Sequence, residues 1–126
     1  GLELTASLRW DDTRMDLNWT HQDPRDAGSH ALLLRRAKDH GSVKLSHQQG
    51  DTTWGAQARI SGKRNDVGGT VLAGYTTLDL TASRRLSPEW TLRGKLENLF
   101  DERYELASGY NTPRRGVFVN LVYQAK

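Results

Sequence analysis

The chain opens on the segment Leu-Glu-Leu-Thr-Ala-Ser-Leu-Arg-Trp, which occupies residues 2–10. Every even position of this segment is apolar, and every odd position is polar or charged. Successive side chains of a β-strand point to opposite sides, so strict alternation predicts a strand with one apolar face. The period of two is therefore the pattern to look for in the rest of the chain.

Six further segments alternate in the same way, and no comparable stretch combines a 3.6-residue period with helix caps. They are residues 14–20, 42–46, 54–61, 77–83, 90–97 and 117–124. The sequence thus predicts an all-β chain with about seven antiparallel strands. Such a strand content exceeds the 20–25% usual in globular proteins and is normal for a membrane barrel.

The connections between these strands alternate between short and long. Residues 11–13, 49–52 and 87–89 are short turns, whereas residues 22–36, 62–74 and 101–115 are long, polar loops. An up-and-down meander would place all short turns at one end and all long loops at the other. That is the arrangement of an outer-membrane barrel, whose short turns face the periplasm.

Aromatic residues mark the two ends of the expected strands. Four of them lie on the apolar face beside the short turns, where membrane-interface aromatics are expected, and Trp19 and Tyr75 are expected nearer the opposite rim. The four are Trp10, Trp54, Trp90 and Tyr123. In the alternative, a soluble β-sandwich, the same aromatic face would pack against a second sheet. Nine charged residues of the polar faces would face water in either case and do not decide between the two.

Composition excludes several classes of protein. The 126 residues suit one domain, and the absence of Cys excludes disulfides, thiolate metal sites and thiol nucleophiles. The longest apolar run is residues 31–34, far short of a membrane-spanning helix, and no signal-peptide pattern opens the chain. The scattered basic residues and the net charge of +3 give no indication of a nucleic-acid partner.

Two motifs in the second half of the chain resemble TonB-dependent outer-membrane receptors. The segment Asn98-Leu99-Phe100-Asp101, followed by Tyr104, is similar to the late-strand motif of that family, and residues 109–115 resemble its last extracellular loop. The hairpin of residues 75–92 matches as well. The closest resemblance is to the vitamin B12 (cobalamin) transporter branch.

The resemblance implies a fold and a function. Residues 1–126 would form the C-terminal segment of a 22-stranded transmembrane barrel, without the plug domain and with the C-terminus on the periplasmic side. The receptor would import a scarce, bulky nutrient, with cobalamin expected, across the outer membrane of a Gram-negative bacterium. Implied partners are outer-membrane lipid and lipopolysaccharide, the remaining barrel and its plug, the TonB system indirectly, and a small-molecule nutrient.

Three other interpretations remain open at this point. A siderophore or haem receptor would share the barrel and differ in its loop contacts. A barrel enzyme, such as an outer-membrane protease or acyl transferase, would need carboxylates and His converging at the top of the lumen. A soluble β-sandwich binding module would need a second sheet.

We expect no enzyme activity, metal or cofactor. None of the four His residues has metal-type spacing, and the neighbours Asp39 and His40 would point to opposite faces of a strand. No catalytic residue is assigned. Because a seven-strand piece would leave both outer edges unpaired, the isolated chain is expected neither to close nor to transport.

The last long loop holds the candidate ligand contacts. Aromatic rings there would stack on a flat ligand, and arginines would meet its anionic groups or the phosphates of lipopolysaccharide. The candidates are Tyr104, Tyr110, Asn111, Arg114 and Arg115. Alternatively, these residues only order the loop. For the strand-end motif we expect Asn98 and Asp101 to bond freed backbone N–H groups and Phe100 to anchor the loop by packing.

Overall fold

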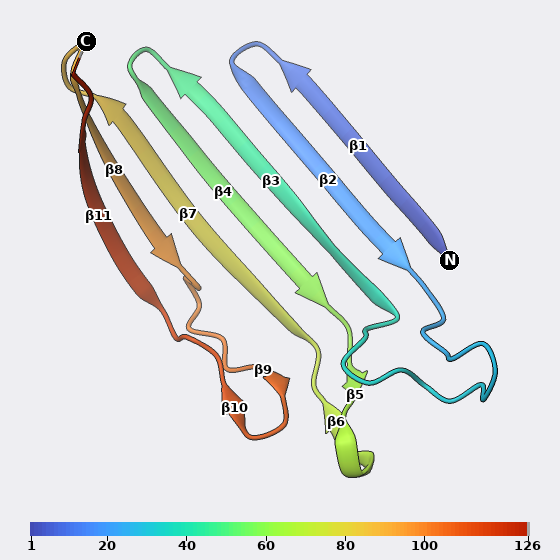
Figure 1. The fold of residues 1–126 in the computed structure, drawn as a ribbon. Coiled ribbons are helices and arrows are strands. Elements are labelled where there is room, and N and C mark those ends of the chain that lie inside the picture. The colour runs from blue at the N-terminus through green and yellow to red at the C-terminus, as the bar shows by residue number, and fades with distance from the viewer. Residues whose placement is uncertain (126) are drawn as a thin grey trace.

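The computed structural model describes residues 1–125, and their long strands form one antiparallel sheet (Figure 1). Each long strand pairs with the next one along the chain, in the order β1-β2-β3-β4-β7-β8-β11. The strands are β1 (Leu2–Trp10), β2 (Thr13–His21), β3 (Asp39–Gln49), β4 (Thr52–Ser61), β7 (Tyr75–Arg85), β8 (Trp90–Glu97) and β11 (Gly116–Tyr123). All seven predicted strands are present, and the predicted meander is confirmed.

Short turns gather at one end of the sheet and long loops at the other (Figure 1). Two-residue turns join β1 to β2 and β3 to β4, and their first residues, Asp11 and Gly50, have φ values of 46° and 57°. Residues 86–89 join β7 to β8, and the Ser87 hydroxyl there accepts the N–H groups of Glu89 and Trp90. The predicted alternation of short and long connections is confirmed.

The long loops contain small elements that the sequence did not predict. In the second loop β5 (Arg64–Asn65) pairs with β6 (Val71–Leu72), and a 3₁₀ turn, η1 (Val67–Gly69), lies between them. In the third loop β9 (Glu105–Ala107) pairs with β10 (Tyr110–Asn111). Strands of two or three residues are too short to display an alternating pattern and therefore cannot be predicted from it.

The pairing register places every apolar set on one face. One row of partners crosses the sheet without a break and contains Leu8, Met15, Leu45, Ala56, Leu80, Leu96 and Val117. The next row belongs to the opposite face and contains Ser7, Asp16, Lys44, Gln57 and Asp79. We call these the apolar face and the polar face.

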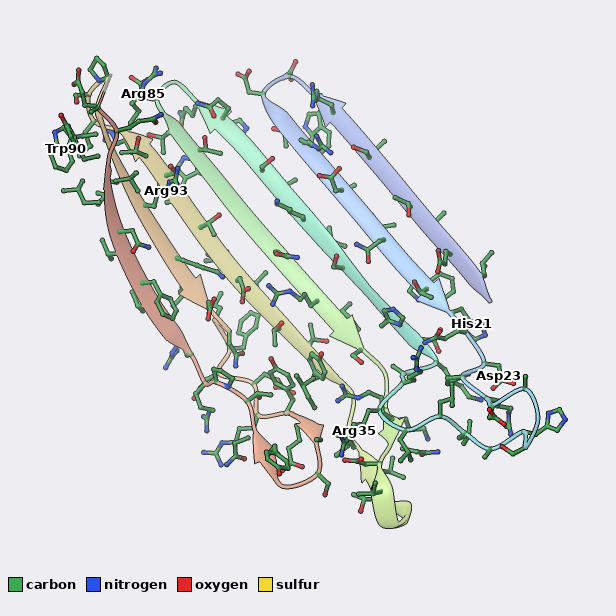
Figure 2. The ribbon with its side chains drawn as sticks, in the orientation of Figure 1. His21, Asp23, Arg35, Arg85, Trp90 and Arg93 are labelled. Atoms are coloured by element: carbon green, nitrogen blue, oxygen red, sulfur yellow. The ribbon has the colours of Figure 1, made fainter. Side chains whose placement is uncertain are left out.

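Most large side chains of the apolar face are exposed and none is buried, because the sheet is a single layer (Figure 2). Leu4 is 52% exposed and Val117 is 72% exposed, and the only buried hydrophobic residues in the described chain are Ala37 and Leu72. No second sheet of the described residues covers this face. The soluble β-sandwich, which needs such a sheet, does not match the structure.

The sheet is open at both edges. Strands β1 and β11 end the strand order, and each has one long neighbour within residues 1–125. The same residues contain no helix long and apolar enough to cross a membrane. Lys126 lies outside the described residues.

Candidate functional site

The three long loops are tied together by one carboxylate, that of Asp66. This side chain is 2% exposed and caps η1, where its Oδ1 accepts the Val67 N–H at 2.8 Å. The same oxygen accepts Arg35 Nε of the first loop at 2.8 Å, and Oδ2 accepts the Ser108 N–H of the third loop at 2.6 Å. A single side chain therefore fixes the three loops relative to one another.

These contacts also favour the charged form of Asp66. The Ser108 N–H has the largest effect in lowering the pKa of this carboxyl below its usual value, followed by the Val67 N–H and then Arg35. Arg35 is itself held in the left-handed region, with φ at 60°, and its N–H donates to the Asn65 carbonyl at 2.7 Å. Figure 2 shows Arg35 among the loops, beyond the ends of the strands.

A stack of one arginine and two tyrosines lies beside this carboxylate. The Arg64 guanidinium is 5.1 Å from the centre of the Tyr75 ring, and the Tyr75 and Tyr104 rings stack with their centroids 4.0 Å apart. Arg64 is 6% exposed, and its Nη2 donates to the Glu105 carbonyl at 2.8 Å. The stack joins the second loop to the third.

Tyr75 lies near the loop end, as expected, but on the polar face of the sheet. Tyr75 pairs with Ser61, whereas the neighbouring pair, Thr76 with Ile60, belongs to the apolar face. Tyr75 therefore lies on the polar face. The other five aromatic candidates lie on the apolar face and are exposed. Trp10, Trp54, Trp90 and Tyr123 are beside the short turns, with the Trp90 and Tyr123 rings 4.9 Å apart, and Trp19 is toward the loop end.

The strand-end motif forms a tight turn at the end of β8. The Asn98 side chain accepts the Glu102 N–H and donates to the Glu102 carbonyl, both at 2.9 Å. Asp101 accepts the Arg115 N–H at 3.0 Å and forms an ion pair with Arg114. Asn98 and Asp101 both have positive φ, at 49° and 55°. These contacts satisfy backbone groups that leave the sheet at this point.

Phe100 does not anchor this turn by packing, contrary to expectation. Its side chain is 72% exposed, and the turn is instead held by hydrogen bonds to the side chains of the flanking Asn98 and Asp101. Leu99 instead continues the ladder through its backbone, with its N–H donating to the Leu78 carbonyl at 2.8 Å. The motif thus works through its polar residues and its backbone.

Asp79, in the hairpin of residues 75–92, contacts the strand-end motif. It is buried on the polar face of β7, and it accepts the Asn98 N–H at 2.9 Å and Arg59 Nη2 at 2.8 Å. It therefore fixes where β8 ends against β7. Nothing in the sequence pattern indicated this contact, because the partners are 19 and 20 residues away in the chain.

The structure brings together three of the five predicted ligand contacts. Tyr104, Asn111 and Arg114 line one hollow of about 660 Å³ at the loop end. Tyr110 lies elsewhere, 73% exposed on the β9–β10 hairpin, and Arg115 is engaged with Asp101 through its backbone. The Arg114 guanidinium also forms an ion pair with Asp101, which orders the loop.

The sequence did not indicate that four residues organise this end of the sheet, namely Arg35, Arg64, Asp66 and Asp79. Their contacts join loops that lie 31 to 42 residues apart in the chain or strands in a particular register. The described residues contain no cluster of three or more potential metal ligands. Asp39 pairs across the strands with His21 at 2.8 Å and does not contact its neighbour His40.

Comparison with known proteins gives one consistent family. The family model described as "TonB dependent receptor-like, beta-barrel" matches residues 1–99. The chain is 28% identical to a vitamin B12 transporter, BtuB, of Photobacterium profundum, an alignment that covers 98% of the chain and 21% of the relative. The chain therefore spans about a fifth of the length of this relative.

Solved structures share the fold at lower identity. A mutant of the ferric enterobactin receptor PfeA from Pseudomonas aeruginosa matches with a TM-score of 0.82 at 20% identity, over 96% of this chain and 21% of that one. The siderophore receptor PiuA from Acinetobacter baumannii matches with a TM-score of 0.77 at 20% identity and the same coverage. At this identity the likeness concerns the fold alone.

Proposed function

The chain belongs to the TonB-dependent receptor family of β-barrels, and on that basis we propose that it forms part of the wall and outer mouth of a nutrient importer. Membership implies the outer membrane of a Gram-negative bacterium. Residues 1–126 are, in this proposal, the C-terminal segment of the barrel. The short turns and the end of β11 would then face the periplasm, and the long loops would face the exterior.

The observation that carries this proposal is the single-layer sheet with an exposed apolar face. Its seven long strands have 8 to 11 residues, close to the length that crosses a bilayer at a tilt. An exposed apolar face is stable in contact with lipid, whereas the polar face is suited to line a water-filled lumen. Trp10, Trp54, Trp90 and Tyr123 would then lie at the periplasmic interface and Trp19 near the outer one, in contact with lipid and lipopolysaccharide.

Cobalamin is the nutrient that we propose first. The support is the alignment with the BtuB relative, which extends over almost the whole chain. The alternative is a siderophore or haem, since siderophore receptors share the fold. In either case the remaining barrel, the plug and, indirectly, TonB would complete the transport machinery, and Tyr104, Tyr110, Asn111, Arg114 and Arg115 are the proposed contacts in the third loop.

The test is uptake by the complete receptor that contains this sequence. We would express it in a Gram-negative strain lacking its own cobalamin receptor and measure uptake of radiolabelled cyanocobalamin, with and without TonB. TonB-dependent uptake is the expected result. Uptake of ferric siderophores or haem in place of cyanocobalamin would establish the alternative nutrient, and transport of none of them would contradict the proposal.

Loop variants locate the contact within the third loop. Tyr104→Phe keeps the ring stacked on Tyr75 and serves as the control, whereas Tyr104→Ala removes it. We expect Tyr104→Ala to raise the concentration needed for half-maximal uptake about tenfold, because an aromatic contact and its support are lost together. Equal uptake by both variants would remove Tyr104 from the proposed contact.

A further inference from the structure

We propose that a second hollow, on the polar face beneath the first long loop, binds an anionic group of the transported nutrient, a phosphate or a carboxylate. The hollow has a volume of about 380 Å³. Its floor includes Asn18, Ser42 and Gln57 of strands β2, β3 and β4, and Arg35 and Arg36 of the first loop lie over it. This inference rests on the proposed function and specifies the chemistry of the ligand.

The charges around this hollow do not balance. Four arginines line it, and no Asp or Glu does: the four are Arg35, Arg36, Arg59 and Arg64. Two of them form ion pairs that neutralise their charge, Arg35 with Asp66 and Arg59 with Asp79. The other two have no carboxylate partner within residues 1–125, so the part of the lining that these residues form has an excess of two positive charges.

The two uncompensated arginines differ in their surroundings. Arg36 is exposed and makes no ion pair within the described chain, so its guanidinium is available to a ligand. Arg64 is buried, donates only to a neutral carbonyl through Nη2, and has no acceptor at Nε in the described structure. A buried charge without a counter-charge is costly, and an anion in the hollow would reduce that cost.

The lining offers the hydrogen bonds that an anion requires. Guanidinium groups bind carboxylates and phosphates through paired N–H donors. The Ser42 hydroxyl, which accepts the Asn18 amide at 2.7 Å, and the Gln57 amide add neutral donors. The hollow beside Tyr104 differs, because Glu105 lines it and Asp101 neutralises its Arg114. The excess positive charge thus belongs to the hollow beneath the first loop.

The side of the sheet identifies the source of the anion. Lipopolysaccharide phosphates would approach from the apolar face, which faces the membrane. Ser42 and Gln57 belong to the polar face, because they alternate with Val43 and Ala56 of the apolar face. The ligand is therefore a soluble anion in the lumen and not a lipid headgroup.

The experiment uses the complete receptor in detergent, with inorganic pyrophosphate as the probe in isothermal titration calorimetry. Arg36→Gln should weaken pyrophosphate binding about tenfold or more, because it removes a charged donor that has no structural partner. Arg36→Lys should restore part of the affinity. Raising the ionic strength should weaken binding by the unaltered receptor, as screening requires.

The matched control is Arg93→Gln, which makes the same change of charge on the polar face at the short-turn end (Figure 2). It should leave pyrophosphate affinity unchanged. Absence of pyrophosphate binding, or an equal loss in both variants, would overturn the proposal. A different result would also overturn the proposal: Arg36→Gln could lose binding to vesicles containing lipid A while its affinity for pyrophosphate stays unchanged. Arg36 would then contact lipopolysaccharide.

Uptake measurements distinguish a failure of the anion site from a failure of the proposed function. TonB-dependent uptake by a receptor that does not bind pyrophosphate would refute the anion site and leave the receptor function in place. Pyrophosphate binding by a receptor that transports neither cobalamin, siderophores nor haem would support the anion site and contradict the proposed function.

Discussion

Asp66 is the residue on which the arrangement of the long loops depends most. Three donors from three loops meet on its two oxygens, and they leave the carboxylate almost without contact with water. Ligand-contacting loops are usually the least stable parts of a barrel. Here one buried charge connects the loop that carries Arg35 to the loop that carries Tyr104.

Replacing Asp66 by Asn should loosen the third loop. An amide cannot accept on both sides at once, so either the Ser108 N–H or the donors at Oδ1 lose their acceptor. Hydrogen exchange of the Ser108 amide in the assembled receptor should then be about tenfold faster or more. Asp26→Asn is the control, because Asp26 caps only its own turn at Gly28 and Ser29. Unchanged protection of Ser108 would show that Asp66 does not hold the loops.

The protection of the Ser108 amide against hydrogen exchange should decrease in acid. Because the pKa of Asp66 is lowered in the folded state, its contribution to stability is fully present above the unfolded pKa of about 4. It is lost as the pH falls through the lower, folded value. Ser108 exchange, corrected for intrinsic rates, should therefore stay protected from neutral pH down to about pH 4 and lose protection only below it.

At the scale of the element, the sequence predicts strands whose alternation repeats over several residues. It does not predict short strands or contacts that depend on the register. A strand such as β1 repeats its alternation over nine residues, and each apolar residue reinforces the same assignment. The two-residue strands β5 and β6 have no such repetition, and the contact of Asp79 with Asn98 depends on the register between β7 and β8. Only part of the candidate site, the third-loop motif, could therefore be predicted from the sequence. The residues that hold this loop in place could not.

The face on which Tyr75 lies follows from the alternation alone. In β7 the apolar residues are at even positions, which Leu78 and Leu80 already show in the sequence. Tyr75 is at an odd position and so belongs to the polar face, where it stacks with Tyr104. Phe100 could not be placed this way, because the left-handed residues at Asn98 and Asp101 end the alternation before and after it.

Neighbouring residues of β7 test the assignment of the two faces. Leu80 lies near the middle of the apolar face, and Thr81 is next to it on the polar face. Leu80→Arg should destabilise the assembled receptor in vesicles by about 2–4 kcal/mol, the cost of a cation facing the bilayer midplane. Thr81→Arg should destabilise the assembled receptor much less, since its side chain faces water. Unfolding in urea measures both, and equal effects would contradict the assignment.

At the scale of the whole molecule, the open edges of the sheet determine what the chain can do. Strands β1 and β11 each present an unpaired edge, and a membrane does not tolerate unpaired backbone groups. Further strands of the receptor must pair there for the wall to close. The chain matches about a fifth of its BtuB relative, which leaves ample length in that relative for such strands.

The most direct measurement is the electrophoretic mobility of the chain with and without boiling, after expression with a signal peptide and extraction into detergent. A closed barrel migrates differently when it is not boiled. We expect no such shift for residues 1–126 alone, and a shift once the remaining strands of the receptor are supplied. A chain that is soluble and monomeric without detergent would contradict the barrel assignment, because its apolar face would then have to be covered by protein.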